Sequence, residues 1–210
     1  MYNKLQYISQ GNTMEEQLYN IHKALDNGCD WIQLRFKNQN KFEAFTLAEA
    51  VKKLCKEYLA TFIINDNVHF AKLLDADGVH LGLSDRSIHE ARLILGTTKI
   101  IGGTANTWED VLQRTAENCD YIGLGPFQFT ATKQNLSPIL GLEGYDSIIE
   151  QMKIKNIQIP IYAIGGITLE HVEGLMQTGI HGIAVSGLIT QNENLSQLIT
   201  QLNKQLYVTI

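Results

Sequence analysis

Residues 31–37 read Trp31-Ile32-Gln33-Leu34-Arg35-Phe36-Lys37, an extended run in which polar and apolar side chains alternate. Successive side chains of a β-strand point to opposite faces, so this run has one polar face, made of Gln33, Arg35 and Lys37. An antiparallel sheet would expose that face to solvent, whereas a barrel strand would turn it inward. Two cations rising toward a barrel mouth require an anion there, because an unpaired buried charge is strongly unfavourable.

Short β-branched or aromatic runs alternate with longer amphipathic segments along the whole chain of 210 residues. The runs expected to form strands are Leu5–Ser9, Trp31–Phe36, Thr61–Ile64, Gly78–Leu81, Lys99–Gly102, Tyr121–Gly123, Ile159–Ala163 and Gly182–Val185. The N-terminus is short, and the first of these strands is expected to be trimmed or to contribute little.

Helices are expected between the strands. Capping-box spacing predicts helix starts at Thr13 with Glu16, at Ser87 with Glu90, and at Thr107 with Asp110. Apolar residues at helical spacing predict a helix over Phe42–Leu59. A further helix is expected over Leu169–Thr178, opened by Thr168 and closed by Gly179 as a left-handed C-cap.

About eight strand-then-helix units without a linker predict a single domain over residues 1–210, either a closed (β/α)₈ TIM barrel or an open doubly wound sheet. The open sheet would normally carry a GxGxxG or Walker-type loop, and the sequence has neither. Polar residues instead follow several different strands, which is where the active sites of barrels lie. The pattern therefore favours the TIM barrel.

Composition narrows the possible partners. The formal net charge of −5 and the absence of a basic run argue against nucleic acid as a partner. No stretch reaches the ~18 apolar residues of a membrane span, and the N-terminus lacks a signal-peptide pattern, so a cytoplasmic location without a membrane partner is expected. Cys29, Cys55 and Cys119 have neither disulfide nor zinc spacing and are interpreted as buried or half-buried free thiols. The sequence leaves open whether the protein forms a homo-oligomer.

Two aspartates follow neighbouring strands. Asp66 ends the third strand and Asp85 lies just beyond the fourth. Together they are a suitable mount for Mg²⁺, which takes a couple of carboxylates along with water and substrate phosphate oxygens. The alternative is that each aspartate caps the helix that follows it. His80, on the fourth strand, is interpreted as a core histidine rather than a base.

Three later segments suggest phosphate binding. The long segment Phe127–Leu142 contains Thr130, Thr132 and Lys133, and loops of this length commonly bind ligands, although a solvated loop without a role remains the alternative. Gly165-Gly166 and Ser186-Gly187 follow the last two strands, where barrels frequently bind phosphate through backbone amides. One cationic, metal-linked site and one amide site would suit an enzyme that joins a diphosphate-activated electrophile to a phosphorylated nucleophile.

These motifs occur together, in order, in one known family. They are Gln33–Lys37, Asn65-Asp66, Asp77–Gly82, Gly125-Pro126 with Thr130–Lys133, Ala163–Ile167 and Gly182–Ser186. In this combination the chain resembles the thiamine phosphate synthase family over nearly its whole length. The resemblance implies a transferase on a TIM barrel, which joins hydroxymethylpyrimidine diphosphate to hydroxyethylthiazole phosphate and releases pyrophosphate by way of a pyrimidine carbocation.

The resemblance also implies individual roles. Asp66 and Asp85 would hold Mg²⁺, and the catalytic residues would be Arg35, Lys37, Lys133 and Thr104, of which Thr104 stands where the family usually has serine. Substrate binding would involve Gln33, Leu34, Arg35, Phe36, Lys37, Asn65, Thr104, Thr130, Ala131, Thr132, Lys133, Gly166, Ser186 and Gly187. Within this set, Gln33, Arg35, Lys37, Asn65 and Lys133 would face the pyrimidine diphosphate, and Thr130, Thr132, Gly166, Ser186 and Gly187 the thiazole phosphate.

Three other functions remain to be compared with this one. A thiazole tautomerase of the same superfamily would bind a thiazole phosphate but no diphosphate, and the joint presence of Arg35, Lys37, Asp66, Asp85 and Lys133 favours the synthase. A catalytically silent phosphate-binding barrel would be expected to have lost one of these charges. Another phosphate-binding barrel enzyme would explain the last two loops but not the paired aspartates.

Overall fold

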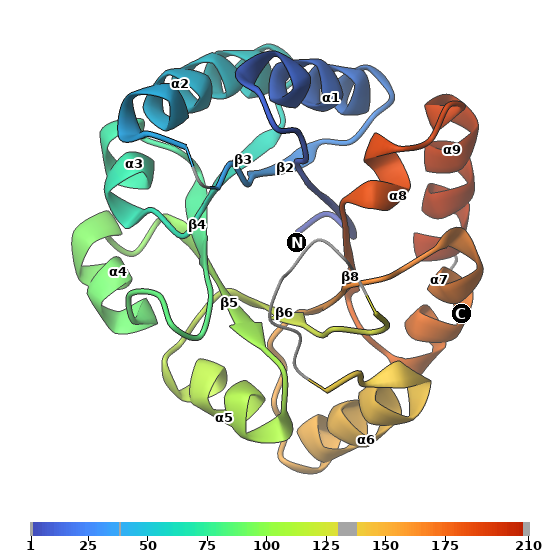
Figure 1. Cartoon of the computed structure of the whole chain (residues 1–210). Helices are drawn as coiled ribbons and strands as arrows, with labels where there is room; N and C mark the ends of the chain where they lie inside the picture. The colour runs from blue at the N-terminus through green and yellow to red at the C-terminus, as the bar shows by residue number, and fades with distance from the viewer. Residues whose placement is uncertain (1, 38, 130–137, 208–210) are drawn as a thin grey trace.

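The computed structural model describes residues 2–37, 39–129 and 138–207. Within them eight parallel strands close into a barrel in chain order, with the last strand beside the first (Figure 1). This confirms the predicted (β/α)₈ TIM barrel. The strands are β1 (Leu5–Ile8), β2 (Trp31–Leu34), β3 (Thr61–Asn65), β4 (Gly78–Leu81), β5 (Ile100–Ala105), β6 (Tyr121–Leu124), β7 (Ile161–Ile164) and β8 (Gly182–Val185).

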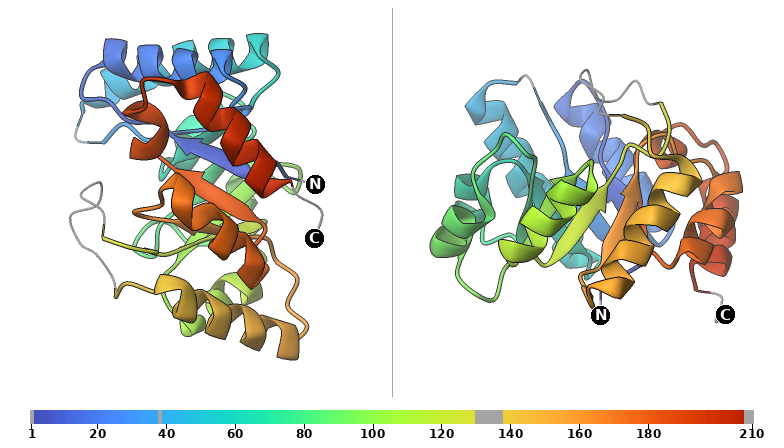
Figure 2. Two further views of the ribbon diagram at one scale, coloured as in Figure 1. Left: turned by 90° about the vertical axis from the view of Figure 1, so that its right-hand side faces the viewer. Right: turned by 90° about the horizontal axis from the view of Figure 1, so that it is seen from below.

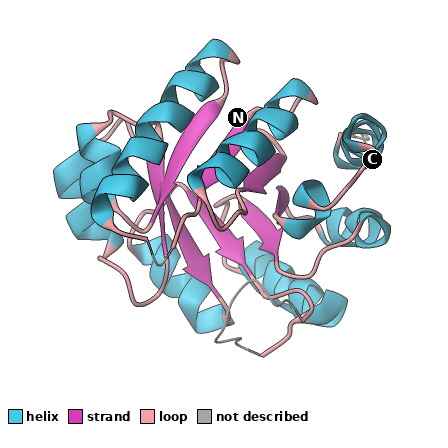
Figure 3. Cartoon of the chain, turned by 45° about the horizontal axis from the view of Figure 1, so that its top comes forward, coloured by secondary structure: helices cyan, strands magenta, loops and turns pink. Residues whose placement is uncertain are grey.

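The helices surround the strands, as Figure 3 shows. In the described residues they are α1 (Met14–Asp26), α2 (Lys41–Glu57), α3 (Val68–Leu73), α4 (Ile88–Leu95), α5 (Trp108–Ala116), α6 (Gly141–Ile154), α7 (Leu169–Thr178), α8 (Gly187–Thr190) and α9 (Leu195–Leu206). The capping boxes predicted for α4 and α5 are confirmed, and Gly179 ends α7 at a left-handed φ of 98°.

The start of α1 differs in one detail from its prediction. The Thr13 side chain accepts from the Glu16 backbone N–H at 3.2 Å, as a capping box requires. The Glu16 carboxylate, however, accepts from the N–H of Asn12 at 2.6 Å rather than from that of Thr13. The helix therefore begins where the pattern predicts, with only half of the predicted box.

Three strand ends differ from their predicted positions by more than one residue. β2 ends at Leu34, because the N–H of Arg35 donates to the Ser9 hydroxyl at 2.9 Å and its carbonyl accepts from the Gln17 side chain at 3.1 Å. β7 begins at Ile161, after Pro160, which has no N–H to donate to a ladder. β5 starts at Ile100 and continues to Ala105, where it pairs with Leu124.

The expectation that the first strand contributes little is wrong. β1 pairs on both sides, with Tyr7 opposite Ile32 of β2 and Leu5 opposite Ile183 of β8, and all four of its residues are buried. Lys4 directly precedes β1, and its backbone N–H donates at 3.0 Å to the hydroxyl of Tyr207, which directly follows α9. Figure 2 shows α9 lying alongside β1. The first strand is thus required to close the barrel.

Two apolar layers hold the fold together. The larger lies between the barrel wall and the helices and includes Ile32. The smaller fills the barrel interior, where Trp31 meets the rings of Tyr121 and Tyr162 edge-on at centroid distances of 5.1 and 5.0 Å. Aromatic pairs of this geometry add about 0.5–1.5 kcal/mol each beyond their burial. Because side chains fill the interior, a ligand can reach the inward-facing side of the strands only at an end of the barrel.

The three cysteines are buried and free, as predicted. In the part of the chain that the structure describes, every helix is too short or too polar to cross a membrane.

Candidate functional site

Gln33 turns into the barrel, as its place on the polar face of β2 predicts. It is buried, and its Nε2 atom donates to Oδ1 of Asn65 at the end of β3, at 2.7 Å. Its Oε1 atom is also buried and has no hydrogen-bond partner among the described residues. An unpaired buried acceptor costs free energy, so this oxygen is suited to receive a donor from a ligand.

Arg35 and Lys37 follow β2 and bring positive charge to the end of β3. Lys37 Nζ lies 2.8 Å from Oδ2 of Asp66. Burial lowers the pKa of Arg35, and the charge of the Asp66 carboxylate partly opposes that shift. The structure therefore brings together the two cations and the aspartate that the sequence predicts as neighbours.

Asp66 owes its position to an unusual backbone conformation just after β3. Its φ is +63°, a left-handed conformation that Asp adopts more easily than most residues, and its N–H donates to the His80 carbonyl of β4 at 2.8 Å. The next residue, Asn67, caps α3 by accepting from the Phe70 N–H at 3.0 Å. The alternative prediction of Asp66 as a helix cap is therefore wrong.

Asp85 is held by the turn that follows β4. The Gly82 N–H donates to its Oδ2 atom at 2.7 Å, and a Cβ at position 82 would lie only 2.8 Å from that oxygen. Glycine is thus required for the carboxylate to approach the backbone so closely. Ser87 caps α4, so the cap alternative is wrong for Asp85 as well.

The two carboxylates lie close enough to affect each other. The pKa of Asp85 is raised, first by partial burial of its carboxyl group and then by hydrogen bonding with Asp66 and the charge of Asp66, while the Gly82 N–H and Lys37 oppose the shift. Such a pair fits Mg²⁺, which commonly binds through one or two carboxylates, water and substrate phosphate. Among the described residues no group of three or more His, Cys, Asp or Glu side chains could hold a metal, so substrate oxygens and water would complete the shell.

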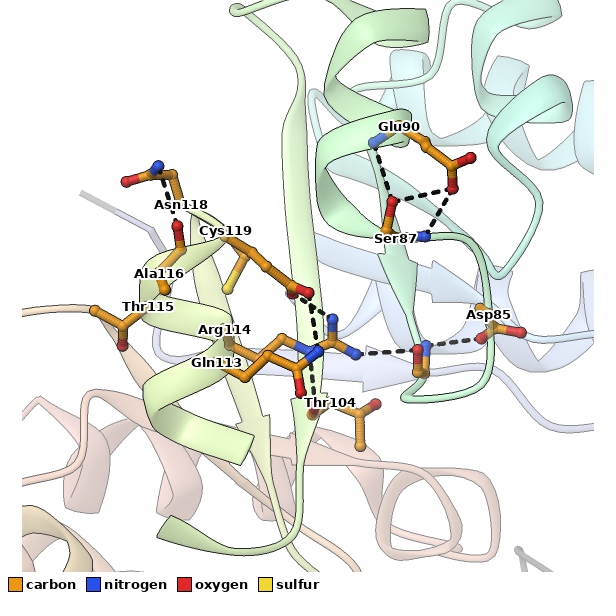
Figure 4. Close-up of polar contacts among 12 residues, drawn as sticks. Asp85, Ser87, Glu90, Thr104, Gln113, Arg114, Thr115, Ala116, Asn118 and Cys119 are labelled. Atoms are coloured by element: carbon orange, nitrogen blue, oxygen red, sulfur yellow. Dashed lines mark hydrogen bonds and ion pairs between the residues drawn. The ribbon is translucent and has the colours of Figure 1, made fainter. Parts of the chain in front are cut away.

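Arg114 of α5, which the sequence analysis missed, supports this region from outside the barrel. Its guanidinium donates to the carbonyl of Thr104 at 3.0 Å and to that of Gly82 at 3.1 Å, and it pairs with the Glu117 carboxylate at 2.7 Å. Figure 4 shows the side chain reaching between Thr104 and the loop that carries Asp85. A Cβ at Gly103 would lie 2.7 Å from Arg114 Cδ, so the glycine in β5 signals its presence.

His80 is a hydrogen-bonded core histidine, as interpreted. Its Nδ1 atom lies 3.0 Å from the Tyr121 hydroxyl and its Nε2 atom 3.0 Å from the hydroxyl of Thr104, near the end of β5. Thr104 is partly exposed, whereas His80 and Tyr121 are buried. The predicted catalytic threonine therefore lies at the end of a polar chain that enters the interior, and the sequence analysis missed the tyrosine behind it.

The segment after β6 lies across the end of β7. Phe127 N–H donates to the Ile164 carbonyl at 2.8 Å, and Gln128 N–H donates to that of Gly165 at 2.9 Å. Gly166 has a φ of +69°, and a Cβ there would lie 2.6 Å from the Phe129 carbonyl oxygen. Glycine at this position therefore allows the loop to pass close to the predicted phosphate site.

Ser186, at the end of β8, also has a polar atom to offer. Its Oγ atom is buried and has no hydrogen-bond partner in the described parts of the chain. Gly187 follows directly as the first residue of α8. The hydroxyl is thus a second unsatisfied polar group, besides Gln33 Oε1, among the predicted site residues.

The remaining predicted residues fall into two groups. Leu34 and Phe36 pack against the outer apolar layer, so their side chains face away from the mouth and only their backbone could contact a ligand there. Thr130, Ala131, Thr132 and Lys133 lie outside the described residues.

A groove of about 560 Å³ lies between α1 and α2 and is lined among others by Leu18, Tyr19 and Lys53. It contains none of the predicted site residues.

Comparison with known proteins agrees with this geometry. The family described as thiamine monophosphate synthase matches residues 5–189. A thiamine-phosphate synthase of Flavobacterium psychrophilum is 74% identical over 98% of this chain and 100% of its own length, and one of Flavobacterium johnsoniae is 63% identical over 100% and 99%. The solved thiamine phosphate pyrophosphorylase of Pyrococcus furiosus superposes with a TM-score of 0.83 at 31% identity, covering 97% of this chain and 95% of its own. The chain therefore belongs to the thiamine monophosphate synthase family, which confirms the resemblance and the predicted transferase function.

Proposed function

We propose that the chain joins hydroxymethylpyrimidine diphosphate to hydroxyethylthiazole phosphate at the C-terminal mouth of its barrel. The observation that carries the assignment of the site is the ion pair of Lys37 with Asp66, next to Asp85. This cluster unites a cation for a diphosphate with two carboxylates for a divalent metal. In the absence of a ligand, these charges neutralise one another.

The diphosphate half of the site would consist of Gln33, Arg35, Lys37, Asn65 and Lys133. Arg35 is a partly buried cation whose lowered pKa reflects its loss of solvation, and a diphosphate would favour its charged form. The Gln33 amide, already held by Asn65, would orient the substrate. Leu34 and Phe36 would contribute only main-chain groups.

The thiazole phosphate half would consist of Gly166, Ser186 and Gly187, together with Thr130 and Thr132. Its support is the unpaired Ser186 Oγ atom, which a phosphate oxygen could satisfy, together with the glycine at position 166. Backbone amides at such loops bind phosphate without a cationic side chain.

The reaction needs little from the side chains beyond binding and charge stabilisation. The C–O bond between the pyrimidine methylene carbon and the diphosphate breaks, and its electron pair leaves on pyrophosphate. The thiazole nitrogen then donates its lone pair to that carbon to form the new C–N bond. Arg35, Lys37 and Lys133 would stabilise the charge that develops on pyrophosphate, and Thr104 would hold a substrate in line. Asp66 and Asp85 would hold Mg²⁺, which when bound would neutralise part of the same charge.

Calorimetric titration of each ligand tests this division. Pyrophosphate should bind only weakly without Mg²⁺ and should lose affinity as ionic strength rises, whereas thiazole phosphate should respond to Mg²⁺ much less. Arg35→Ala should weaken the first ligand and spare the second. If the protein binds thiazole phosphate but ignores Mg-pyrophosphate at millimolar concentration, it is a tautomerase or a binding barrel instead. Incubation with both precursors and Mg²⁺ should yield thiamine phosphate.

We further infer a single domain over residues 1–210 that works on small molecules in the cytoplasm. The three buried free thiols suit a reducing compartment. Size-exclusion chromatography with light scattering would establish whether the barrel forms a homo-oligomer.

A further inference from the structure

A chain of polar side chains runs from the barrel interior to its mouth. Gln6 of β1 donates from Nε2 to the Tyr121 hydroxyl at 3.0 Å. That hydroxyl lies 3.0 Å from Nδ1 of His80, and His80 Nε2 lies 3.0 Å from the Thr104 hydroxyl. Four strands, β1, β6, β4 and β5, therefore supply one continuous set of hydrogen bonds that ends at the predicted catalytic threonine.

The neighbouring strands leave room for this chain at specific glycines. A Cβ at Gly102 would lie 2.2 Å from Cζ of Tyr121, and a Cβ at Gly123 would lie 3.1 Å from Cε1 of His80. Gln6, Tyr121 and His80 are 1%, 0% and 7% exposed, so water competes little for their polar groups. A buried chain with reserved space is expected to have a defined hydrogen-bond direction.

The direction follows from counting donors. The Tyr121 oxygen accepts from Gln6, and its single proton needs an acceptor, because a buried hydroxyl proton left unpaired is costly. Within the described residues, the hydrogen-bond partner beside Gln6 is His80 Nδ1. When Nδ1 of a neutral imidazole accepts a hydrogen bond, the ring proton is on Nε2. Nε2 then donates to the Thr104 oxygen, and the hydroxyl proton of Thr104 is directed to another acceptor.

We propose that Tyr121 and His80 are positioning residues that fix the Thr104 hydroxyl as a hydrogen-bond donor toward the bound substrate. This proposal rests on the function proposed above, because it deepens the role of a residue at the same mouth. The acceptor it calls for is a lone pair, such as a ring nitrogen or a phosphate oxygen of the substrate. Thr104 would thus act through its proton rather than through its oxygen.

Tyr121→Phe tests the proposal with the loss of a single hydroxyl. Without the hydroxyl, Tyr121 no longer holds Nδ1 unprotonated, and in the Nδ1–H tautomer Nε2 accepts from Thr104, which then cannot donate to the substrate. We expect kcat/KM to fall by about tenfold, the size of one hydrogen bond. Tyr162→Phe is the matched control: its buried ring lies in the same interior cluster, but its hydroxyl donates to the Asn3 carbonyl at 2.6 Å, away from Thr104.

A double-mutant cycle separates positioning from general damage. Thr104→Val should cost about as much as Tyr121→Phe, and the double variant should cost little more than either, because both remove the same hydrogen bond. Thr104→Ser should keep most of the activity. Additive losses in the double variant would show that Tyr121 supports the fold rather than the threonine.

The ring nitrogens of His80 give a readout that does not depend on activity. With ¹⁵N-labelled histidine, the wild-type protein should show a protonated Nε2 and an unprotonated Nδ1, and Tyr121→Phe should change this pattern whereas Tyr162→Phe should not. A wild-type Nδ1–H tautomer, or equal kinetics for the two Phe variants, would overturn the proposal. If the wild type makes no thiamine phosphate, the proposed function fails, yet the tautomer measurement still decides the hydrogen-bond direction.

Discussion

Lys37 Nζ and Asp66 Oδ2 lie 2.8 Å apart, and this ion pair connects the segment after β2 to the end of β3. Each partner is partly exposed, so the pair itself adds little to stability. What matters is the position of its charges, because the pair holds a cation and a carboxylate side by side at the barrel mouth. We expect a bound ligand to take up the cation and the carboxylate separately.

Asp66→Asn should therefore remove most of the activity and leave the fold intact. Asparagine tolerates the left-handed backbone at this position but cannot offer Mg²⁺ a charge. Asp75→Asn is a matched control, because Asp75 is also left-handed, at φ +49°, and pairs with Lys99 at 2.5 Å. Activity across a Mg²⁺ titration and thermal unfolding measure the two effects. Full turnover of Asp66→Asn in EDTA would refute the metal role.

The raised pKa of Asp85 predicts a stabilising effect of Asp85→Asn in Mg²⁺-free protein. A carboxyl group whose pKa is higher in the folded than in the unfolded state stabilises the fold at pH values below its unfolded pKa. This contribution is lost as the pH rises through the folded pKa. At neutral pH, Asp85→Asn should therefore melt higher than the wild type in EDTA, and the difference should vanish below the ordinary value of 3.8.

The stabilised variant should lose its response to Mg²⁺. Asp75→Asn should show the opposite sign, because Lys99 lowers the pKa of Asp75 by hydrogen bonding and charge, so its carboxylate favours the fold above its unfolded pKa. Melting curves at several pH values, each with EDTA and with Mg²⁺, make the measurement. An Asp85→Asn protein less stable than the wild type in EDTA at neutral pH would contradict the sign.

Arg114→Met should destabilise the protein by about 3–5 kcal/mol, because it leaves the Glu117 carboxylate and two backbone carbonyls without their buried partner. Glu117 is more exposed than Arg114, so we expect Glu117→Gln to cost only about 1 kcal/mol. Urea denaturation gives both values. Near-equal stability of Arg114→Met and wild type would mean that solvent replaces the guanidinium.

Gly102→Ala and Gly174→Ala should act in opposite directions. At residue 102 a Cβ would overlap the Tyr121 ring, and overpacking of this kind costs about 1–3 kcal/mol or more. At residue 174, inside α7, the nearest atom, Leu142 Cδ1, is at an ordinary 3.4 Å, so the higher helix propensity of alanine should stabilise the protein by about 0.5–1 kcal/mol. Thermal unfolding of both variants is the test, and a stabilised Gly102→Ala would refute the packing argument.

The sequence predicts the barrel because its evidence is local. Alternation over residues 31–37 specifies an inward Gln33 and an outward Ile32, and both orientations are confirmed. The strand ends are harder to predict from the sequence, because they depend on residues far along the chain. β2 ends where Ser9 and Gln17 take over the hydrogen bonds of the Arg35 backbone. Only the proline before β7 gave a local signal for its start.

The residues missed at the site share one property. Tyr121 reaches His80 across 41 positions of sequence, and Arg114 reaches Gly82 across 32, so no short motif contains both partners. The local sequence signals of these two side chains are the glycines at positions 102 and 103. Glycine is unfavourable within a strand unless another side chain needs the space. The roles of the predicted ligand-binding residues stay predictions until ligands are bound.

The aromatic cluster of Trp31, Tyr121 and Tyr162 has a kinetic consequence. Because it fills the interior of the barrel, both precursors must enter and both products must leave by the same opening. Pyrophosphate or thiamine phosphate that remains at the mouth therefore excludes the next substrate. Product inhibition should accordingly be competitive with at least one precursor, and product departure becomes a step at which turnover can be limited.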